Sequence, residues 1–200
     1  MKADQAIKAL VEGNKRFVDA KANDGELSTQ IGEVNTKSQS PFAIILGCSD
    51  SRAPLELIFN CGVGDLFVVR VAGNIASASQ IGSIEFACQH FNTELVVVLG
   101  HTHCGAVEAT LNSLHSGAQN ISNNIADIVN IITPAVSGVV NGSSDDRDHL
   151  LRQATHANVQ QSVDNLSLNS SVIRELISNN KLKIIGAVYS IESGDVQFLD

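Results

Sequence analysis

Four segments of strand length in this chain are almost continuously apolar, and they constrain its fold more than any other feature. They lie at residues 42–46, 66–69, 95–99 and 182–189. A strand with one face in water alternates apolar and polar residues, whereas a parallel strand covered by helices on both faces is apolar throughout. Stretches of helical periodicity separate these segments, so the order favours an α/β fold with a mainly parallel β-sheet flanked by helices. We also expect an N-terminal helical arm and a C-terminal hairpin strand, turned at residues 193–195.

The 200 residues fit a single domain. We divide it into a helical arm with its connecting segment, residues 1–40, and an α/β core, residues 41–200. Apolar periodicity predicts a helix over residues 75–91, capped by Asn74, and another from about residue 105. Pro134 and Gly138 should interrupt an apolar stretch over residues 121–132, and a last helical region should extend from residue 145 or 146 to about 179.

Charge and hydropathy narrow the possible partners. The formal net charge is -8, and there is no lysine between Lys37 and Lys181. Nucleic-acid binding needs clustered cations, so DNA and RNA are not expected partners. No apolar run reaches the roughly 18–20 residues that span a bilayer, so no membrane partner is expected either. Because the first residues lack an apolar signal core, we expect a cytoplasmic protein; an organellar or exported form whose leader was removed would have the same residues.

The cysteines indicate where the chemistry lies. Cys61 and Cys88 have no histidine or carboxylate at ligand spacing and are expected to be small core residues. Cys48 directly follows the first predicted strand, whereas His101 and Cys104 follow the third. Ligands of open α/β sheets bind beyond the carboxyl ends of the strands, so these three side chains should converge. Two thiolates and an imidazole suit tetrahedral Zn²⁺, and three protein ligands with one open position is the catalytic pattern.

A carboxylate and a guanidinium follow the first of these cysteines. Asp50 is close enough to reach the metal, and Arg52 can hold the same carboxylate in a bidentate pair. Binding of Asp50 to zinc would close the site, and its capture by Arg52 would let water take the fourth position. His103, beside the site, is either a proton carrier or an exposed spectator. Gly62 and Gly64 lack the third glycine of a dinucleotide fingerprint, which argues against a zinc alcohol dehydrogenase.

Residues 48–52, Cys-Ser-Asp-Ser-Arg, and residues 100–105, Gly-His-Thr-His-Cys-Gly, together resemble the metal motifs of β-class carbonic anhydrases. The likeness extends through residues 12–17, 64–70 and 72–74 to the final strand, and so covers nearly the whole chain. It implies one zinc per chain, held by Cys48, His101 and Cys104, with Asp50 as the fourth ligand of a closed state. It also implies reversible hydration of CO₂ to bicarbonate and a proton by attack of zinc-bound hydroxide, with Asp50 and Arg52 as the catalytic pair.

The same resemblance implies a substrate pocket at a dimer interface. Gln39, Phe67 and Gly105 match substrate-binding positions, and the chain is expected to form a homodimer or homotetramer that takes CO₂ and bicarbonate. Ile45 stands where members with an allosteric bicarbonate site have tryptophan, which favours the plant-type, non-allosteric subgroup. Phe86 replaces a frequent tyrosine.

Two alternatives share the zinc ligands. One is a hydrolase of carbonyl sulfide or carbon disulfide on the same scaffold. The other is a non-catalytic protein whose zinc only fastens the fold. The Asp50–Arg52 pair favours an enzyme, because a structural site has no need of it. If Asp50 has two partners, activity should rise above neutral pH and fall on the acid side.

Overall fold

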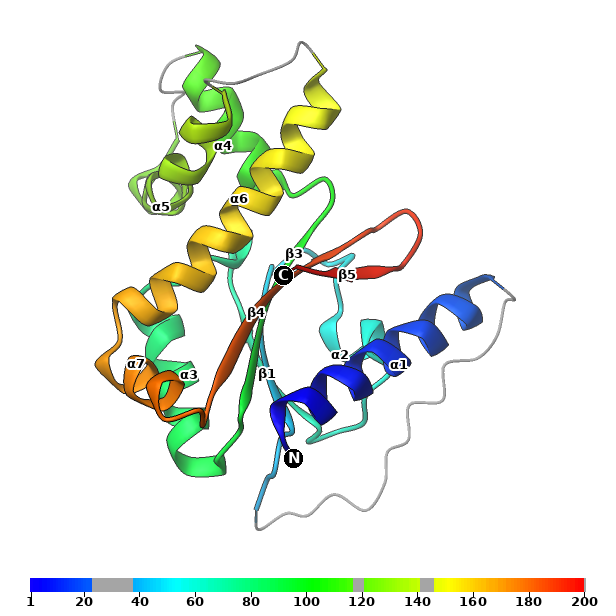
Figure 1. Ribbon diagram of the computed structural model, residues 1–200. Helices are drawn as coiled ribbons and strands as arrows, with labels where there is room; N and C mark the ends of the chain where they lie inside the picture. Colours follow the sequence, from blue (N-terminus) through cyan, green and yellow to red (C-terminus); the bar gives the residue numbers. More distant parts are fainter. Residues whose placement is uncertain (23–37, 117–120, 141–145, 200) are drawn as a thin grey trace.

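A five-stranded sheet forms the centre of the computed structural model, which describes residues 1–22, 38–116, 121–140 and 146–199 (Figure 1). The strand order is β2-β1-β3-β4-β5. The first four strands in this order are parallel, and β5 is antiparallel to β4. The mainly parallel sheet and the C-terminal hairpin strand are therefore confirmed. The strand bounds are β1 Ala43–Gly47, β2 Leu66–Arg70, β3 Leu95–His101, β4 Lys183–Tyr189 and β5 Val196–Phe198.

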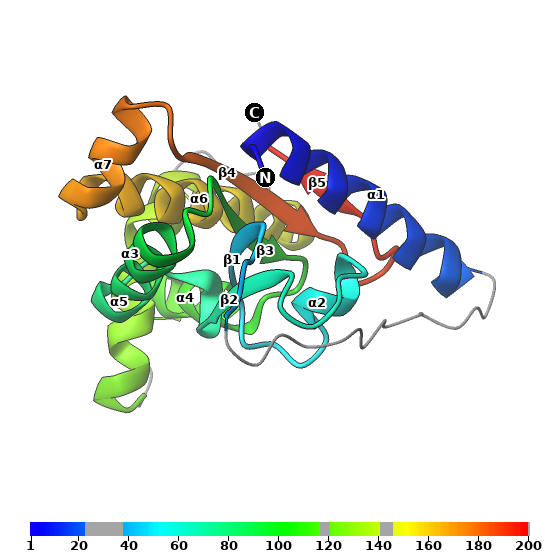
Figure 2. The same cartoon turned by 90° about the horizontal axis from the view of Figure 1, so that it is seen from below.

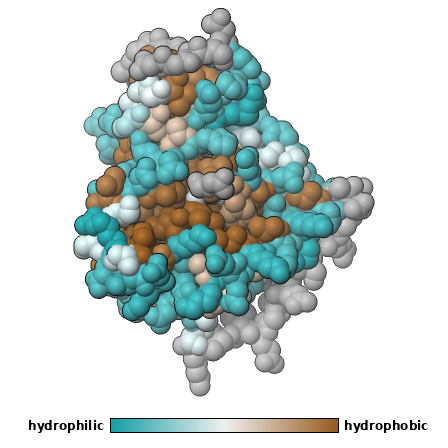
Figure 3. All heavy atoms as spheres, in the orientation of Figure 1, coloured by the Kyte–Doolittle hydropathy of each residue, from teal (hydrophilic) through white to brown (hydrophobic). Residues whose placement is uncertain are grey.

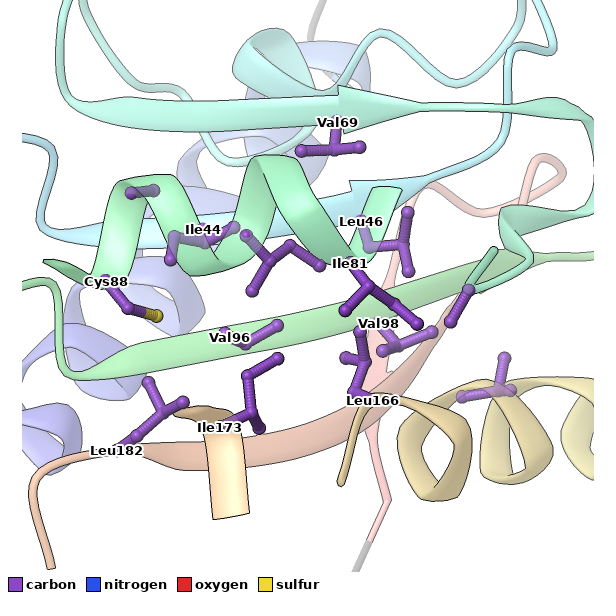
Figure 4. Packing of buried hydrophobic residues seen from close by; sticks show 14 of the residues in the cluster. Ile44, Leu46, Val69, Ile81, Cys88, Val96, Val98, Leu166, Ile173 and Leu182 are labelled. Carbon is purple, nitrogen blue, oxygen red and sulfur yellow. The ribbon is translucent and has the colours of Figure 1, made fainter. Parts of the chain in front are cut away.

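Helices cover both faces of the sheet, which explains why β1 and β3 are buried at every position. Ile44 and Leu46 point to the face covered by α3, α6 and α7 (Figure 4). The alternate residues of the same strand, Ala43 and Ile45, point to the opposite face, where α1 and α2 pack (Figure 2). The bounds are α1 Ala3–Ala22, α2 Leu55–Ile58, α3 Ala78–Phe91, α6 Arg147–Leu168 and α7 Ser171–Ser178.

A third apolar cluster lies beyond the carboxyl ends of the strands. It is formed by α4 (Gly105–Ser116), α5 (Asn123–Val140) and the first half of α6. Cys48 and Cys104 are part of this cluster. The candidate metal ligands therefore lie between the carboxyl end of the sheet and an apolar layer of helices, where solvent screening is weak.

The N-terminal arm is covered by its own chain. Ala6 and Leu10 of α1 are fully buried, against Phe59 and the α2 face of the sheet. A Cβ atom at Gly13 would lie 1.9 Å from the Phe59 carbonyl oxygen, so only glycine lets the helix approach so closely. Because this apolar face is already packed, α1 does not need a partner subunit to bury it.

The predicted start of the 75–91 helix was wrong by three residues. A 3₁₀ turn at Ala72–Asn74 comes first, and α3 begins at Ala78 after the extended Ser77. Gly73 and Asn74 have φ angles of 72° and 45°, in the left-handed region, which no α-helix can include. Asn74 consequently ends the turn and does not cap the helix.

Two other helix boundaries also differ from the prediction. Pro134 lies inside α5, which continues to Val140. Val129, Ile132 and Val136 are buried on both sides of the proline, so tertiary packing holds the helix together despite the lost hydrogen bond. The last helical region divides into α6 and α7 because the Ser170 side chain accepts a hydrogen bond from the Ile173 amide and caps a new helix.

The outer surface has both apolar and hydrophilic regions. Apolar residues gather in a band over β4 and on either side of it, between hydrophilic residues (Figure 3). Among the described helices, none is both long and apolar enough to cross a bilayer.

Candidate metal centre

Three predicted metal ligands come together at the carboxyl end of the sheet. Cys48 follows β1 directly, His101 is the last residue of β3, and Cys104 immediately precedes α4. Their candidate ligand atoms all lie within 4.8 Å of one another, and the side chains are buried. Because β1 and β3 are neighbouring parallel strands, their register brings together residues that lie 53 positions apart in the chain.

The imidazole of His101 is oriented for metal binding. Its Nδ1 atom donates to the carbonyl oxygen of Thr102 at 2.8 Å, which leaves Nε2 with a free lone pair. Nε2 is buried, and no residue in the described part of the chain forms a hydrogen bond with it. An unpaired polar atom in a dry site costs free energy, and a metal ion bound at Nε2 would remove that cost.

The two thiols are arranged to lose their protons to a cation. A hydrogen bond from the Cys104 side chain lowers the pKa of Cys48, and the same interaction raises the pKa of Cys104. The Gly73 amide also donates to Cys48 Sγ at 3.4 Å. A thiophilic divalent cation bound between the two sulfurs would displace their protons. Two sulfurs and one imidazole nitrogen are a donor set that fits zinc.

Asp50 is held by Arg52 in this structure. The Arg52 backbone N–H and Nε donate to Asp50 Oδ1 at 2.9 and 3.0 Å, and Nη2 donates to Oδ2 at 2.8 Å. These bonds keep the pKa of Asp50 well below its usual range. Asp50 Oδ2 lies 3.9 Å from His101 Nε2, so the ionised carboxylate borders the ligand cluster.

A second arginine fixes the loop that carries Cys48 and Asp50. Arg70, at the end of β2, donates from Nε to the Cys48 carbonyl oxygen at 2.9 Å and from Nη2 to the Asp50 carbonyl oxygen at 2.7 Å. Arg52 also donates to the His103 carbonyl oxygen at 3.1 Å, and so joins the two ligand loops. The guanidinium groups therefore set the backbone on which the site is built.

The other predicted residues lie at different distances from the ligands. Gly105 is exposed at the start of α4, next to Cys104. Phe67 is half-buried on β2 and packs near Phe91, with ring centroids 6.0 Å apart. Gln39 is exposed and precedes β1, at the amino end of the strand, so within this chain it does not join the ligand cluster.

Cys61 and Cys88 stay outside the site. Cys88 is buried in the core and Cys61 is half-buried, and burial raises the pKa of each thiol to about 12. The core prediction is confirmed for Cys88.

Supporting residues that the sequence analysis did not identify come from distant segments. Asn158 on α6 is buried and donates to the Gly73 carbonyl oxygen at 2.8 Å, which fixes the turn that bonds Cys48. Glu192, in the turn between β4 and β5, bonds Thr102 and His103. Neither residue belongs to a local motif, and only the fold brings it near the ligands.

The fold and the site together define an α/β protein with a buried cluster of two thiols and one imidazole at the carboxyl end of its sheet, a donor set that fits zinc. Comparison with known proteins makes this class specific. The sequence profile of the carbonic anhydrase family matches residues 43–196. Carbonic anhydrase 2 of Mycobacterium tuberculosis is 38% identical over 191 residues, covering 94% of this chain and 89% of that protein. The carbonic anhydrase of Mycolicibacterium smegmatis is 35% identical over 192 residues, covering 96% and 91%.

Solved structures agree with these relatives. The β-carbonic anhydrase CafA of Aspergillus fumigatus superposes with a TM-score of 0.74 at 26% identity, covering 97% of this chain and 90% of that one. The β-carbonic anhydrase CcaA superposes with a TM-score of 0.72 at 27% identity, covering 97% and 87%. The chain belongs to the β-carbonic anhydrase family, whose reaction is the reversible hydration of CO₂ to bicarbonate and a proton.

Proposed function

We propose that this chain hydrates CO₂ at the Cys48–His101–Cys104 centre and that each chain holds one zinc there. The observation that carries the proposal is the convergence of three buried side chains, His101, Cys48 and Cys104, whose candidate ligand atoms lie within 4.8 Å of one another. Zinc bound at this site supplies a water of lowered pKa, and hence a hydroxide nucleophile near neutral pH.

The protein's own contribution to the reaction is orientation. Asp50 is ionised throughout the working pH range because Arg52 lowers its pKa, so its oxygens can only accept hydrogen bonds. With zinc bound, Oδ2 would accept a hydrogen bond from the O–H group of the nucleophile and so direct its oxygen lone pair toward the carbon of CO₂. Arg52 holds the carboxylate through three hydrogen bonds, so a metal held by Cys48, His101 and Cys104 would keep one coordination position for water.

Cysteine variants test the metal site with a control from the same chain. We expect Cys104→Ser to lose zinc, because a hydroxyl is a poor replacement for a thiolate ligand. Cys61→Ser should keep one zinc per chain, since Cys61 lies outside the cluster. The zinc content of each gel-filtered variant is measured by mass spectrometry and compared with that of the wild type. Full zinc in Cys104→Ser would contradict the ligand assignment.

Asp50 is tested by turnover with zinc measured in the same sample. Asp50→Asn should retain zinc and lose at least about 100-fold in CO₂ hydration, because the amide can offer a donor where an acceptor is needed. Asp127→Asn, an exposed position on α5, is the matched control. A zinc-loaded Asp50→Asn enzyme with wild-type turnover would overturn the role of Asp50.

We propose further that substrate binds where two chains meet, with Phe67 and Gly105 of one chain and Gln39 of the other. Gln39 is exposed at the far end of β1 from Cys48, which supports a role in a neighbouring site. The edge strand β2 and the adjacent Phe86, 46% exposed, offer an apolar surface for the second copy. β-Carbonic anhydrases of Sordaria macrospora, which share the fold, are described as tetrameric.

The oligomer proposal is tested by mass in solution. Wild-type protein should be a dimer or tetramer by light scattering, and Phe86→Glu should shift the mass toward the monomer and reduce turnover. Leu168→Glu changes an apolar residue that is 69% exposed at the end of α6, and it should leave the mass unchanged. A fully active monomeric wild type would contradict the shared site.

The remaining assignments are narrower. We propose a plant-type, non-allosteric enzyme, supported by Ile45, which is fully buried in the packed core beneath α1 and α2. We propose one domain, with residues 1–40 as its arm and residues 41–200 as its core, supported by the packing of α1 on that core. A cytoplasmic location is supported by the need to keep the ligand thiols of Cys48 and Cys104 reduced.

A further inference from the structure

A carboxylate from the C-terminal hairpin bonds the loop between two metal ligands. Glu192 Oε2 accepts from Thr102 Oγ1 at 2.8 Å, and Oε1 pairs with His103 Nε2 at 2.5 Å. Thr102 and His103 are the two residues that separate His101 from Cys104. One side chain, about ninety positions away in sequence, therefore holds the whole segment that links these ligands.

This segment has a backbone conformation that needs support. His103 has a φ angle of 54°, in the left-handed region that a residue with a side chain rarely occupies. Such conformations persist only where the surrounding structure imposes them. The carbonyl oxygen of Thr102 also accepts the hydrogen bond that orients the His101 ring, so any rotation of this peptide would turn Nε2 away from the thiols.

The hairpin itself is a fixed support. Asn14 on α1 donates to the Gly194 carbonyl oxygen at 2.9 Å and accepts from the Val196 amide at 2.9 Å. Lys21 Nζ donates to the Glu192 carbonyl oxygen at 2.7 Å. Figure 1 shows α1 lying along the side of this hairpin. The backbone of Glu192 is thus held independently of its side chain.

The hairpin also bonds the ligand loop without Glu192. The Thr102 amide donates to the Tyr189 carbonyl oxygen, and the Ile191 amide donates to Thr102 Oγ1 at 3.0 Å. Thr102 Oγ1 therefore accepts one hydrogen bond, from the Ile191 amide, and donates another, to Glu192 Oε2. Removing the carboxylate would free the Thr102 hydroxyl and the His103 ring while the backbone bonds remain.

We propose that Glu192 is a positioning residue for the metal centre, whose carboxylate fixes Thr102 and His103 and thereby sets His101 Nε2 and Cys104 Sγ for zinc. The inference rests on the proposed zinc site. Glu192 does not touch the ligand atoms, so its effect is on the geometry and retention of the metal and only through these on turnover.

Metal retention provides a direct test. Zinc-loaded enzyme is mixed with a chromophoric chelator, and the rate of zinc release is followed. Glu192→Ala should release zinc about 10-fold faster than wild type, in the range found for outer partners of metal ligands. Glu192→Gln, which keeps an acceptor for Thr102, should stay within about 3-fold of wild type. Glu175→Ala, an exposed glutamate on α7, is the control and should not differ from wild type.

A double-variant cycle separates positioning from general stability. Thr102→Val should also release zinc faster than wild type, and the double variant should be slower than the product of the two single effects predicts, because both changes break the Thr102–Glu192 contact. The cobalt-substituted Glu192→Ala enzyme should show altered visible d–d bands, since those bands report the geometry around the metal. A merely structural role would leave the bands unchanged.

The outcomes distinguish this inference from the proposed function. Wild-type zinc release and unaltered cobalt bands in Glu192→Ala would overturn the positioning role, even with normal CO₂ hydration in the wild type. If the two single effects on the zinc-release rate simply multiply in the double variant, the positioning role of Glu192 is overturned as well. If Glu192→Ala does not fold, Thr102→Val decides: unchanged zinc release in that variant overturns the inference. A wild type that binds no zinc would instead contradict the proposed function.

Discussion

Gly100 precedes His101 on β3 and lets α6 pack directly on the sheet. A Cβ atom at Gly100 would lie 2.5 Å from Val159 Cγ2, whereas ordinary contact begins at 3.4 Å. Gly100→Ala must therefore push α6 and β3 apart locally by about 1 Å. Over-packing of this size costs about 1–3 kcal/mol of unfolding free energy, or about 2–12 °C in melting temperature for a chain of this length.

The assay is denaturant and thermal unfolding of Gly100→Ala, Val159→Ala and the double variant. Val159 is fully buried, so Val159→Ala alone also destabilises the protein. In the double variant the new methyl group occupies space vacated by Val159, so its stability should equal or exceed that of Val159→Ala. Zinc release should be faster in Gly100→Ala than in the wild type, because the displaced strand carries His101. In the double variant it should be slower than in Gly100→Ala. Wild-type stability of Gly100→Ala, or additive losses in the double variant, would show that the close contact between Gly100 and Val159 does not require glycine.

Three further predictions concern charges and thiols. Arg52→Ala should keep its zinc and lose about 10–100-fold in CO₂ hydration by stopped flow, whereas Arg147→Ala, which removes an exposed ion pair with α4, should be unaffected; equal turnover in both variants would contradict this. The pKa of Glu192 is lowered to about 2 from an ordinary 4.5, chiefly by its own backbone N–H and by Thr102, so its stabilisation is complete above about pH 4.5 and is lost as the pH falls toward 2. The difference in unfolding free energy between wild type and Glu192→Gln, about 1 kcal/mol or less because the group is exposed, should therefore vanish across that range. Thermal unfolding at each pH measures it, and a difference in melting temperature that stays constant would count against this prediction. Cys61 and Cys88, with pKa values raised to about 12 by burial, should resist iodoacetamide at pH 8 until urea unfolds the chain, as peptide mass spectrometry can show; rapid labelling of the native protein would be the contrary result.

The sequence predicted those features that depend on local pattern and on strand order. Continuous apolar runs such as that containing Ile44 and Ile45 identified the parallel strands, because burial on both faces leaves no polar position. The convergence of Cys48 with His101 and Cys104 followed from the meeting of parallel strands at one edge. The candidate ligand set could therefore be predicted from the sequence alone.

Features that depend on contacts between distant segments could not be predicted in this way. Pro134 predicts a helix break locally, but the packing of α5 on α6 overrides it. The left-handed residues Gly73 and Asn74 delay the start of α3, and their conformation is fixed by Asn158, eighty-five positions from Gly73. Glu192 has no motif around it, and its role depends on the hairpin that α1 anchors.

We expect CO₂ hydration to depend on zinc at the Cys48–His101–Cys104 centre, with Asp50 and Arg52 beside it. The most direct test is stopped-flow CO₂ hydration at mildly alkaline pH on protein whose zinc is measured in the same sample. We expect one zinc per chain, turnover that disappears when a chelator strips the metal, and turnover that returns on adding zinc. One zinc per chain without CO₂ hydration at any pH would contradict the proposed function.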